Sequence, residues 1–301
     1  MTFKKLSGDL SINGASYTLV NTIAGLASAV KNGPAGNYAL AADYDASKDG
    51  AYGSSPIQSD MQGALEGLGN TISNLSIEIP LEKSGNSTGL IALSEGTVAD
   101  IRVTHASIDL EENERKMGIA TAGILIGYNT GSVLRSYVDG IIQIPGETAG
   151  GGMVGTNDGI ISESESEAKV SVILKGYWAG GMVGTNGGTI TKSFAGGDVT
   201  TATKKGALLG GLVGWNDPFG TIDNTYALGN ATDGRRNGAS GGLAGQNDGK
   251  ISTSYSTGKA TAQPYAGGLV GFDQAQAGSL NDTYWDTDTS GITNPSQALE
   301  I

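Results

Sequence analysis

A pentapeptide of the form Gly-Gly-x-Val/Ala-Gly recurs along the second half of this 301-residue chain. The last glycines of successive copies are 26 to 31 residues apart, a period that is typical of stacked repeat architectures. The unit itself is too short to stand alone, so each copy must pack against its neighbours. The copies lie at 151–155, 180–184, 210–214, 241–245 and 267–271, with a weaker one at 123–127.

Two further positions repeat in step with the pentapeptide. Asparagine stands two residues after most of the final glycines, and about eight residues later a serine or threonine precedes an aromatic residue. Between these positions, apolar and polar residues alternate as in a half-buried strand. One copy has Glu165 in place of the aromatic residue, and another has Asp273 in place of asparagine. The asparagines are Asn129, Asn157, Asn186, Asn216 and Asn247, and the aromatic residues are Tyr137, Phe194, Tyr226, Tyr255 and Tyr284.

This repeat predicts an all-β fold, a single-stranded right-handed parallel β-helix. Each unit has room for three short strands, and stacking units at about 4.8 Å brings equivalent residues into columns. We expect about eight such coils over residues 61–286, with Leu212, Leu243 and Leu269 lying one above another. Glycine is expected where the chain bends sharply or takes a positive φ. The handedness follows precedent for parallel connections, and residues 287–301 are expected to form a tail or linker.

Residues 1–60 have a different pattern and predict an N-terminal cap. Residues 21–32 fit a short amphipathic helix that Asn21 or Thr22 can cap, and residues 36–45 fit the first strand. A cap is needed because an uncovered coil exposes apolar core and unpaired strand edges. The apolar face of the helix comprises Ile23, Leu26, Ala27 and Val30.

Charge and composition exclude several classes of function. The chain has 18 Lys and Arg against 30 Asp and Glu, a net charge of −12, which disfavours binding to nucleic acid. It has no cysteine, which excludes disulfides, thiolate metal sites and thiol nucleophiles. His105 is the sole histidine, and no apolar run is long enough to predict a membrane helix. We therefore expect a monomer with no cofactor and no membrane insertion.

The glycine anchors, followed by asparagine and by Ser-Tyr-Ser-Thr-Gly at 254–258, resemble the GLUG repeat of large bacterial surface proteins. Residues 21–45 and 284–291 look like the segments that flank such repeats in filamentous-haemagglutinin-like adhesins, which are exported by two-partner secretion. The resemblance implies a secreted or cell-surface β-helix that serves as an adhesin shaft or binding surface. It supplies no catalytic residues, and no export signal is visible in residues 1–30.

Contact with carbohydrate or another host-surface polymer is the favoured function, and aromatic side chains are its candidates. Tyr226 and Tyr255 belong to the aromatic column, which can form a sugar-stacking platform or line a core or groove. Trp178, Trp215 and Trp285 occupy different positions in their units, so we expect them to form no column and to make individual exposed contacts. The asparagine column can bind glycan hydroxyls, or its members can bond one another and the turn backbone.

A glycan-active enzyme, a polysaccharide hydrolase or lyase, is the competing hypothesis, because parallel β-helices often carry such activities. Hydrolysis needs two carboxylates about 5 to 9.5 Å apart. Asp217 and Asp248 would lie one coil apart at a similar azimuth, although ordinary turn chemistry explains the same residues. The regular repeat weighs against an enzyme, and the irregular region 78–120 is where an active site would be sought.

Other charged residues have simpler explanations. A lyase would need a basic residue near acids, and the dibasic pairs 204–205 and 235–236 are available, but they fit solvated loop tips. The acidic runs 109–114 and 163–167 could attract calcium, yet neither has the spacing of a known calcium loop. His105 has no second histidine or cysteine beside it and fits a strand position. We therefore expect no metal site.

Overall fold

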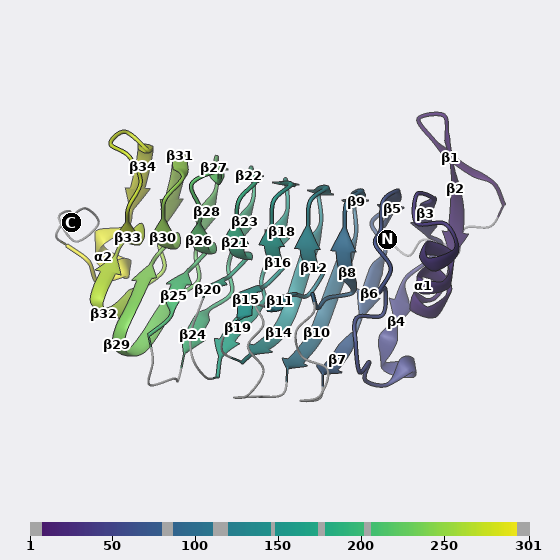
Figure 1. Cartoon of the computed structure of the whole chain (residues 1–301), viewed down its shortest axis with the longest axis horizontal. Coiled ribbons are helices and arrows are strands. Elements are labelled where there is room, and N and C mark those ends of the chain that lie inside the picture. The colour runs from purple at the N-terminus through teal and green to yellow at the C-terminus, as the bar shows by residue number, and fades with distance from the viewer. Residues whose placement is uncertain are drawn as a thin grey trace.

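The computed structural model describes residues 8–79, 87–110, 120–145, 148–173, 178–201 and 206–293, apart from the side chains of residue 120 and residues 235–237. These residues form an elongated stack of parallel β coils of about eight turns, with one short helix near the N-terminus (Figure 1). The structure thus confirms the predicted fold class.

Each complete coil has five strand positions, where we expected three, and a long strand can occupy two of them. Strands at the same place in successive coils pair in parallel, so they form five ranks along the stack. The first rank is a separate sheet of β8 (Ile91–Ser94), β12 (Ile126–Asn129), β16 (Val154–Asn157), β21 (Val183–Asn186), β26 (Val213–Asn216), β30 (Ala244–Asn247) and β33 (Val270–Asp273). The second comprises β5 (Ala64–Glu66), β9 (Thr97–Ala99), β13 (Ser132–Leu134), β17 (Ile160–Ser162), β22 (Thr189–Thr191), β27 (Thr221–Asp223), β31 (Lys250–Ser256) and β34 (Leu280–Trp285).

The remaining ranks complete the coil, and several long strands take part in two of them. The third comprises β4 (Tyr44–Asp45), β6 (Thr71–Ser73), β10 (Arg102–Leu110), β14 (Tyr137–Ile144), β18 (Glu165–Ser166), β23 (Phe194–Ala195) and β28 (Tyr226–Ala227), and continues into β31 and β34. The fourth runs from β7 (Ser76–Ile79) through β10, β14, β19 (Lys169–Val172) and β24 (Val199–Thr201) to β29 (Ala231–Gly241) and β32 (Ala260–Gly267). The fifth comprises β11 (Ala120–Gly123), β15 (Thr148–Gly151), β20 (Trp178–Gly180) and β25 (Leu208–Gly210), then β29 and β32.

The N-terminal end is covered by the predicted helix, α1 (Ile23–Asn32). Thr22 caps it, since its hydroxyl accepts a hydrogen bond from the Gly25 N–H at 2.9 Å, and Ile23, Leu26 and Val30 are buried. Beside α1 lies a hairpin that we did not predict. Its strands β1 (Leu10–Ile12) and β2 (Ala15–Val20) are antiparallel and joined through Asn13 and Gly14.

Parallel pairing extends from β5 back through β3 (Asn37–Leu40) to β2. A short 3₁₀ helix, η1 (Ala46–Asp49), follows β4, and α2 (Thr287–Ser290) follows the last strand. The boundary that we place at residue 60 stays a prediction.

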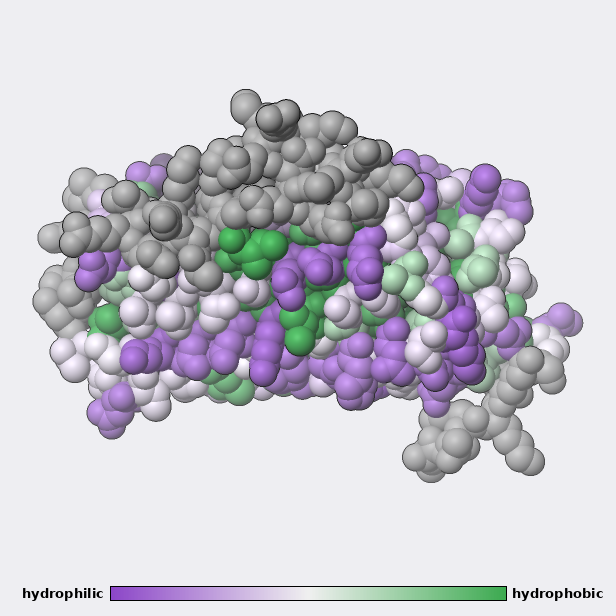
Figure 2. Space-filling model, turned by 90° about the horizontal axis from the view of Figure 1, so that it is seen from below, coloured by the Kyte–Doolittle hydropathy of each residue, from purple (hydrophilic) through white to green (hydrophobic). Residues whose placement is uncertain are grey.

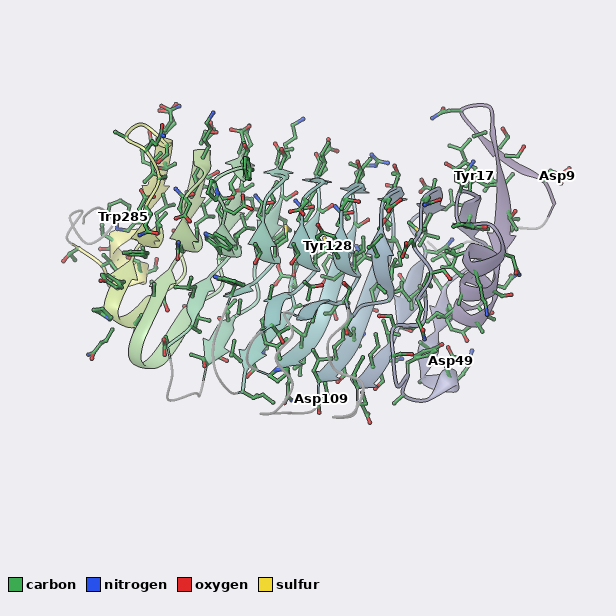
Figure 3. The ribbon with its side chains drawn as sticks, in the orientation of Figure 1. Asp9, Tyr17, Asp49, Asp109, Tyr128 and Trp285 are labelled. Carbon is green, nitrogen blue, oxygen red and sulfur yellow. The ribbon has the colours of Figure 1, made fainter. Side chains whose placement is uncertain are left out.

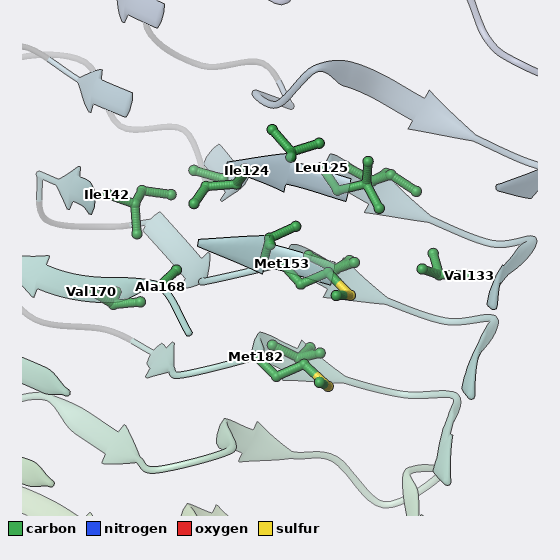
Figure 4. Packing of buried hydrophobic residues seen from close by; sticks show 14 of the residues in the cluster. Ile124, Leu125, Val133, Ile142, Met153, Ala168, Val170 and Met182 are labelled. Atoms are coloured by element: carbon green, nitrogen blue, oxygen red, sulfur yellow. The ribbon is translucent and has the colours of Figure 1, made fainter. Parts of the chain in front are cut away.

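The core is a set of apolar columns inside the stack. Leu212, Leu243 and Leu269 lie one above another as predicted, because the Leu212 N–H donates to the Leu243 carbonyl at 2.9 Å and the Leu243 N–H to the Leu269 carbonyl at 2.8 Å. Figure 4 shows the same arrangement for Met153 and Met182 in successive coils. The outer surface is different: where Figure 2 shows described residues on the face along the bottom of Figure 1, many are hydrophilic, with a few apolar groups near the centre.

The repeated asparagines form a buried ladder inside one row of corners. Each side-chain amide donates to the amide oxygen of the next asparagine at 2.8 Å and to a backbone carbonyl in its own turn. All five asparagines are fully buried, so contact with a glycan is excluded for them. Asp273 ends the ladder, accepting from Asn247 at 3.0 Å. A carboxylate fits there because the last position must accept a hydrogen bond from Asn247 and has no further asparagine to which it would donate.

The anchor glycines are needed for close approach rather than for a positive φ. A Cβ on Gly184 would come 2.6 Å from the Gly150 nitrogen of the preceding coil, and one on Gly180 would come 2.1 Å from the Val183 oxygen. The described glycines with a positive φ lie outside these pentapeptides. One row of corners instead takes φ of 46° to 53° at other residue types, namely Asp100, Arg135, Glu163, Lys192, Asn224, Thr253 and Asp282. A positive φ, one of the two reasons for which we expected glycine, therefore applies to glycines outside the pentapeptides and not to the pentapeptide glycines.

The asparagine ladder leads to a stability prediction. Asn186→Ala removes the side-chain acceptor of the Asn157 amide and the donor to the Asn216 oxygen, and both of these side chains are fully buried. We expect a loss of about 1–3 kcal/mol in the free energy of unfolding, measured by urea denaturation. Asn281→Ala is the control, because Asn281 is exposed and lies outside the ladder. Equal stabilities of the two variants would contradict the role of the ladder.

The close approach of backbone at the pentapeptide glycines leads to a second stability prediction. Gly184→Ala places a methyl group against backbone that cannot move aside, so we expect unfolding at a clearly lower temperature or an insoluble protein. Gly53→Ala is the matched control, since nothing lies within 4 Å of its added Cβ. Circular dichroism melts compare the two, and a Gly184→Ala melt equal to wild type would refute the explanation.

Candidate functional site

The most distinctive outward feature is a column of aromatic side chains on the third rank. Phe194, Tyr226, Tyr255 and Tyr284 hold the same position in four successive coils, and we name them the aromatic ladder. The ring centroids of Phe194 and Tyr226 are 4.6 Å apart with planes 6° from parallel, and those of Tyr226 and Tyr255 are 5.1 Å apart at 8°. Tyr255 is 42% exposed and Tyr284 66%. The column thus lies on the surface and does not line the core.

The rings point outward because the residue before each of them points inward. Ser193 before Phe194 and Ser254 before Tyr255 are buried at a row of corners, as is Ser164 before Glu165, and each hydroxyl donates to the carbonyl two residues earlier. The same hydroxyls accept hydrogen bonds of 3.1 to 3.2 Å from backbone N–H groups of the preceding coil. Strand alternation then places the next side chain on the outside. The repeated Ser-aromatic pair is therefore one buried polar link and one surface ring.

Stacking decides which part of each ring a ligand can reach. Parallel rings at this separation cover one another's facing sides, so Phe194, Tyr226 and Tyr255 present mainly ring edges and, for the tyrosines, phenolic groups. Burial and the neighbouring Tyr255 raise the pKa of Tyr226, which keeps its hydroxyl protonated and able to donate. A sugar-stacking platform needs open ring faces, and within the stacked rings these are taken.

The column is interrupted at one coil. Glu165 stands between Tyr137 and Phe194, and Glu167 lies two residues further on. The pKa of Glu167 is raised, first by burial and then by the charges of Glu165 and Asp139. Below the break, the guanidinium carbon of Arg102 lies 4.0 Å from the centre of the Tyr137 ring. This contact shows that a ring in this column can hold a cation against its face.

The tryptophans lie elsewhere than we expected. Trp178 and Trp215 stack on one another with centroids 5.1 Å apart, although they come from different ranks, because both indoles are long enough to meet across the corner between β20 and β26. Both are half-buried. Trp285 packs against the core at the C-terminal end (Figure 3), where its Nε1 donates to the Ile292 carbonyl at 3.1 Å. None of the three is an isolated exposed contact, and a role in ligand binding stays a prediction for each.

A second column, of aspartates, follows the asparagine ladder. Asp158 and Asp217 approach each other across Gly187, for their oxygens lie 2.6 and 2.8 Å from the place of its missing Cβ. Asp158 accepts a hydrogen bond from the Tyr128 hydroxyl, whose pKa this bond raises to about 12. Tyr128 lies midway along the stack (Figure 3). Asp248 accepts hydrogen bonds from Trp215 Nε1 at 2.9 Å and from Gln246 at 3.0 Å.

Asp217 has a raised pKa, as a catalytic proton donor does, but its hydrogen bonds are those of a turn residue. Burial raises its pKa, and the charges of Asp158 and Asp248 add to the shift. Against this, its Oδ1 accepts hydrogen bonds from the N–H groups of Phe219 at 2.8 Å and Gly220 at 3.1 Å. Asp217 and Asp248 therefore lie near enough to repel each other, and each already has protein partners.

The remaining candidates gain little support. In the described part of the chain, no group of three His, Asp or Glu side chains could hold a metal ion. Of the acidic runs, Glu163 pairs with Lys192 at 4.0 Å, and residues 111–114 lie outside the described residues. The same holds for Lys204 and Lys205 and for the side chains of the 235–236 pair. His105 lies within β10. No helix among the described residues is long and apolar enough to cross a membrane.

The shifted pKa of Asp217 gives a pH prediction. A raised pKa means that the folded state binds the proton more tightly than the unfolded state, so stability falls as pH rises from about 4 through the raised value. Asp217→Asn keeps an oxygen for the turn and removes this penalty. We expect it to stabilise the protein by less than about 1 kcal/mol at pH 7, with no gain at pH 3. Denaturation at both pH values tests this, with the exposed Asp9→Asn as control; an unchanged or lower stability at pH 7 would contradict it.

Comparison with known proteins bears on the fold. No protein-family model matches the chain, and no curated protein matches it in sequence. Among solved structures, one named IgA1 Protease superposes with a TM-score of 0.54 at 18% sequence identity. The match covers 85% of this chain but 20% of that protein, so this chain spans about a fifth of it. At such identity the likeness shows a shared fold alone, and the GLUG assignment stays a prediction.

Proposed function

We propose that this chain is an extracellular segment of a bacterial surface or secreted adhesin of the GLUG-repeat, filamentous-haemagglutinin-like kind. In this proposal the β-helix is a rigid shaft that contacts carbohydrate or another host-surface polymer. The aromatic ladder carries the proposal, because it repeats one outward contact group in four successive coils. The fold shared with IgA1 Protease supports an extracellular setting, since that protein is named for an antibody target.

The geometry favours many weak contacts over one strong pocket. Successive coils offer a tyrosine hydroxyl and a ring edge about every 4.8 Å along the stack. A polymer lying along the shaft can meet several of these groups at once, and linked contacts gain avidity without a deep site. The rigid, ladder-linked core keeps the groups in line.

A double substitution at the exposed end tests the proposal. Tyr255→Ala with Tyr284→Ala removes two exposed side chains from the ladder. We expect binding to a glycan array or to host cells to fall about tenfold or more, since linked contacts multiply. Tyr17→Ala, on β2 at the other end of the stack, is the control. Absence of binding by the wild-type protein to any glycan or cell surface would overturn the proposal.

A glycan-active enzyme remains the second candidate, because the pKa of Asp217 is raised beside Asp158 and Asp248. Since both carboxylates of the predicted pair are engaged by the protein, we expect no release of reducing sugar from acidic or neutral polysaccharides. Release that Asp217→Asn or Asp248→Asn abolishes would replace the adhesive function with hydrolysis.

A further inference from the structure

The aromatic ladder has carboxylates at both of its ends. At the lower end, Glu165 holds the next position in the column and Glu167 lies two residues on. At the upper end, Asp282 and Asp286 lie two residues before and after Tyr284. Asp282 is exposed, and hydrogen bonds from the α2 backbone lower the pKa of Asp286, so Asp286 carries a negative charge at neutral pH. We name these two pairs the lower and upper acidic ends.

Between the acidic ends, the face offers hydrogen-bond donors and an apolar edge. The hydroxyls of Tyr226, Tyr255 and Tyr284 project there, and Leu228, in the neighbouring column, is 45% exposed. The edge of an aromatic ring carries partial positive charge, and phenolic O–H groups donate. Such a surface suits the carbonyl oxygens of an extended peptide. It suits a sugar less well, because the facing sides of the Phe194, Tyr226 and Tyr255 rings, on which a pyranose would stack, are covered.

Among the described residues, no ion pair joins Glu165 or Glu167 to a basic side chain. Lys169 lies two residues after Glu167, and Lys192, two residues before Phe194, pairs with Glu163 in the corner column at 4.0 Å. The pKa of Glu167 is raised first by burial and then by the charges of its acidic neighbours Glu165 and Asp139. One coil before Glu165, the Arg102 guanidinium lies against the ring of Tyr137 in the same column. A basic group can therefore bind to this column.

We propose that the aromatic ladder docks an extended peptide segment with a basic side chain at each end. The acidic ends are four coil steps apart, which is about 19 Å at the usual strand spacing. An extended chain covers that distance in about six residues. The two basic groups bind the lower and upper acidic ends, and the peptide carbonyls between them accept hydrogen bonds from the tyrosine hydroxyls. This inference rests on the proposed adhesive function and specifies its partner as a protein.

Labelled heptapeptides test the proposal with the whole chain. The first has arginine at both ends and alternating threonine and valine between them, the second has glutamate at both ends, and the third has both arginines at its centre. Fluorescence anisotropy at low salt should show the first binding about tenfold or more tightly than the other two, and more weakly as salt rises. Equal binding of all three peptides would overturn the proposal.

Matched variants locate the contact. Glu165→Gln with Glu167→Gln should weaken binding of the first peptide about tenfold, whereas Glu163→Gln, in the same segment but paired with Lys192, should leave it unchanged. Tyr226→Phe with Tyr255→Phe keeps the stacked rings and removes the donors, so binding should fall several-fold. Circular dichroism confirms that each variant is folded. If Glu163→Gln weakens peptide binding as much as the Glu165/Glu167 double substitution does, the effect comes from net charge alone, and the proposal is overturned.

The glycan alternative is a separate arm of the same experiment. A glucosamine hexamer carries positive charge without peptide carbonyls. If a labelled hexamer binds the wild-type chain and the arginine peptide does not, a protein partner is ruled out. If the wild-type chain adheres to host cells and no peptide binds, the docking proposal fails while the adhesive function stands. If neither occurs, both fail.

Discussion

Parallel backbone hydrogen bonds hold successive coils about 4.8 Å apart, and the rest of the structure depends on this spacing. Any residue type that repeats at one position must be compatible with its own copies directly above and below. Asparagine satisfies this condition because one side chain both donates and accepts, and the buried ladder uses both properties at every step. Serine does so at the other row of corners with its hydroxyl and a backbone N–H.

Charged residues meet the same condition in two ways: opposite charges alternate in successive coils, or a small residue separates like charges. In the corner column, Arg135 pairs with Asp100 at 2.5 Å, and Lys192 lies 4.0 Å from Glu163, so opposite charges follow one another. In the aspartate column, Gly187 stands between Asp158 and Asp217 and gives both carboxylates room. The raised pKa of Asp217 shows that the separation is incomplete. Repetition in this stack therefore limits where carboxylates can follow one another.

The features that repeat along the sequence could be predicted from it, whereas contacts that depend on the length and direction of individual side chains could not. The period, the apolar alternation and the capping helix were sufficient for the coil stack, the leucine column and α1, because each is a local or strictly periodic signal. The hairpin at Asn13 and Gly14 has a recognised turn signal that was overlooked. The stacking of Trp178 on Trp215 could not be predicted, since it joins two positions that do not repeat and depends on side-chain length across a corner. The outward direction of the aromatic column needed knowledge of which corner buries the serine.

The asparagine ladder has a direction, with every amide donating toward the C-terminal side. Each internal coil thus presents an acceptor to one neighbour and a donor to the other, and any of these coils could follow any other. Gene duplication or deletion of whole units between Asn129 and Asn247 would preserve every link in the chain of amides. Differences in unit length, 26 to 31 residues, are compatible with this exchange because the paired strand positions stay in register. Shaft length is consequently a property that evolution, or a designer, can change without altering the rule that joins one turn to the next.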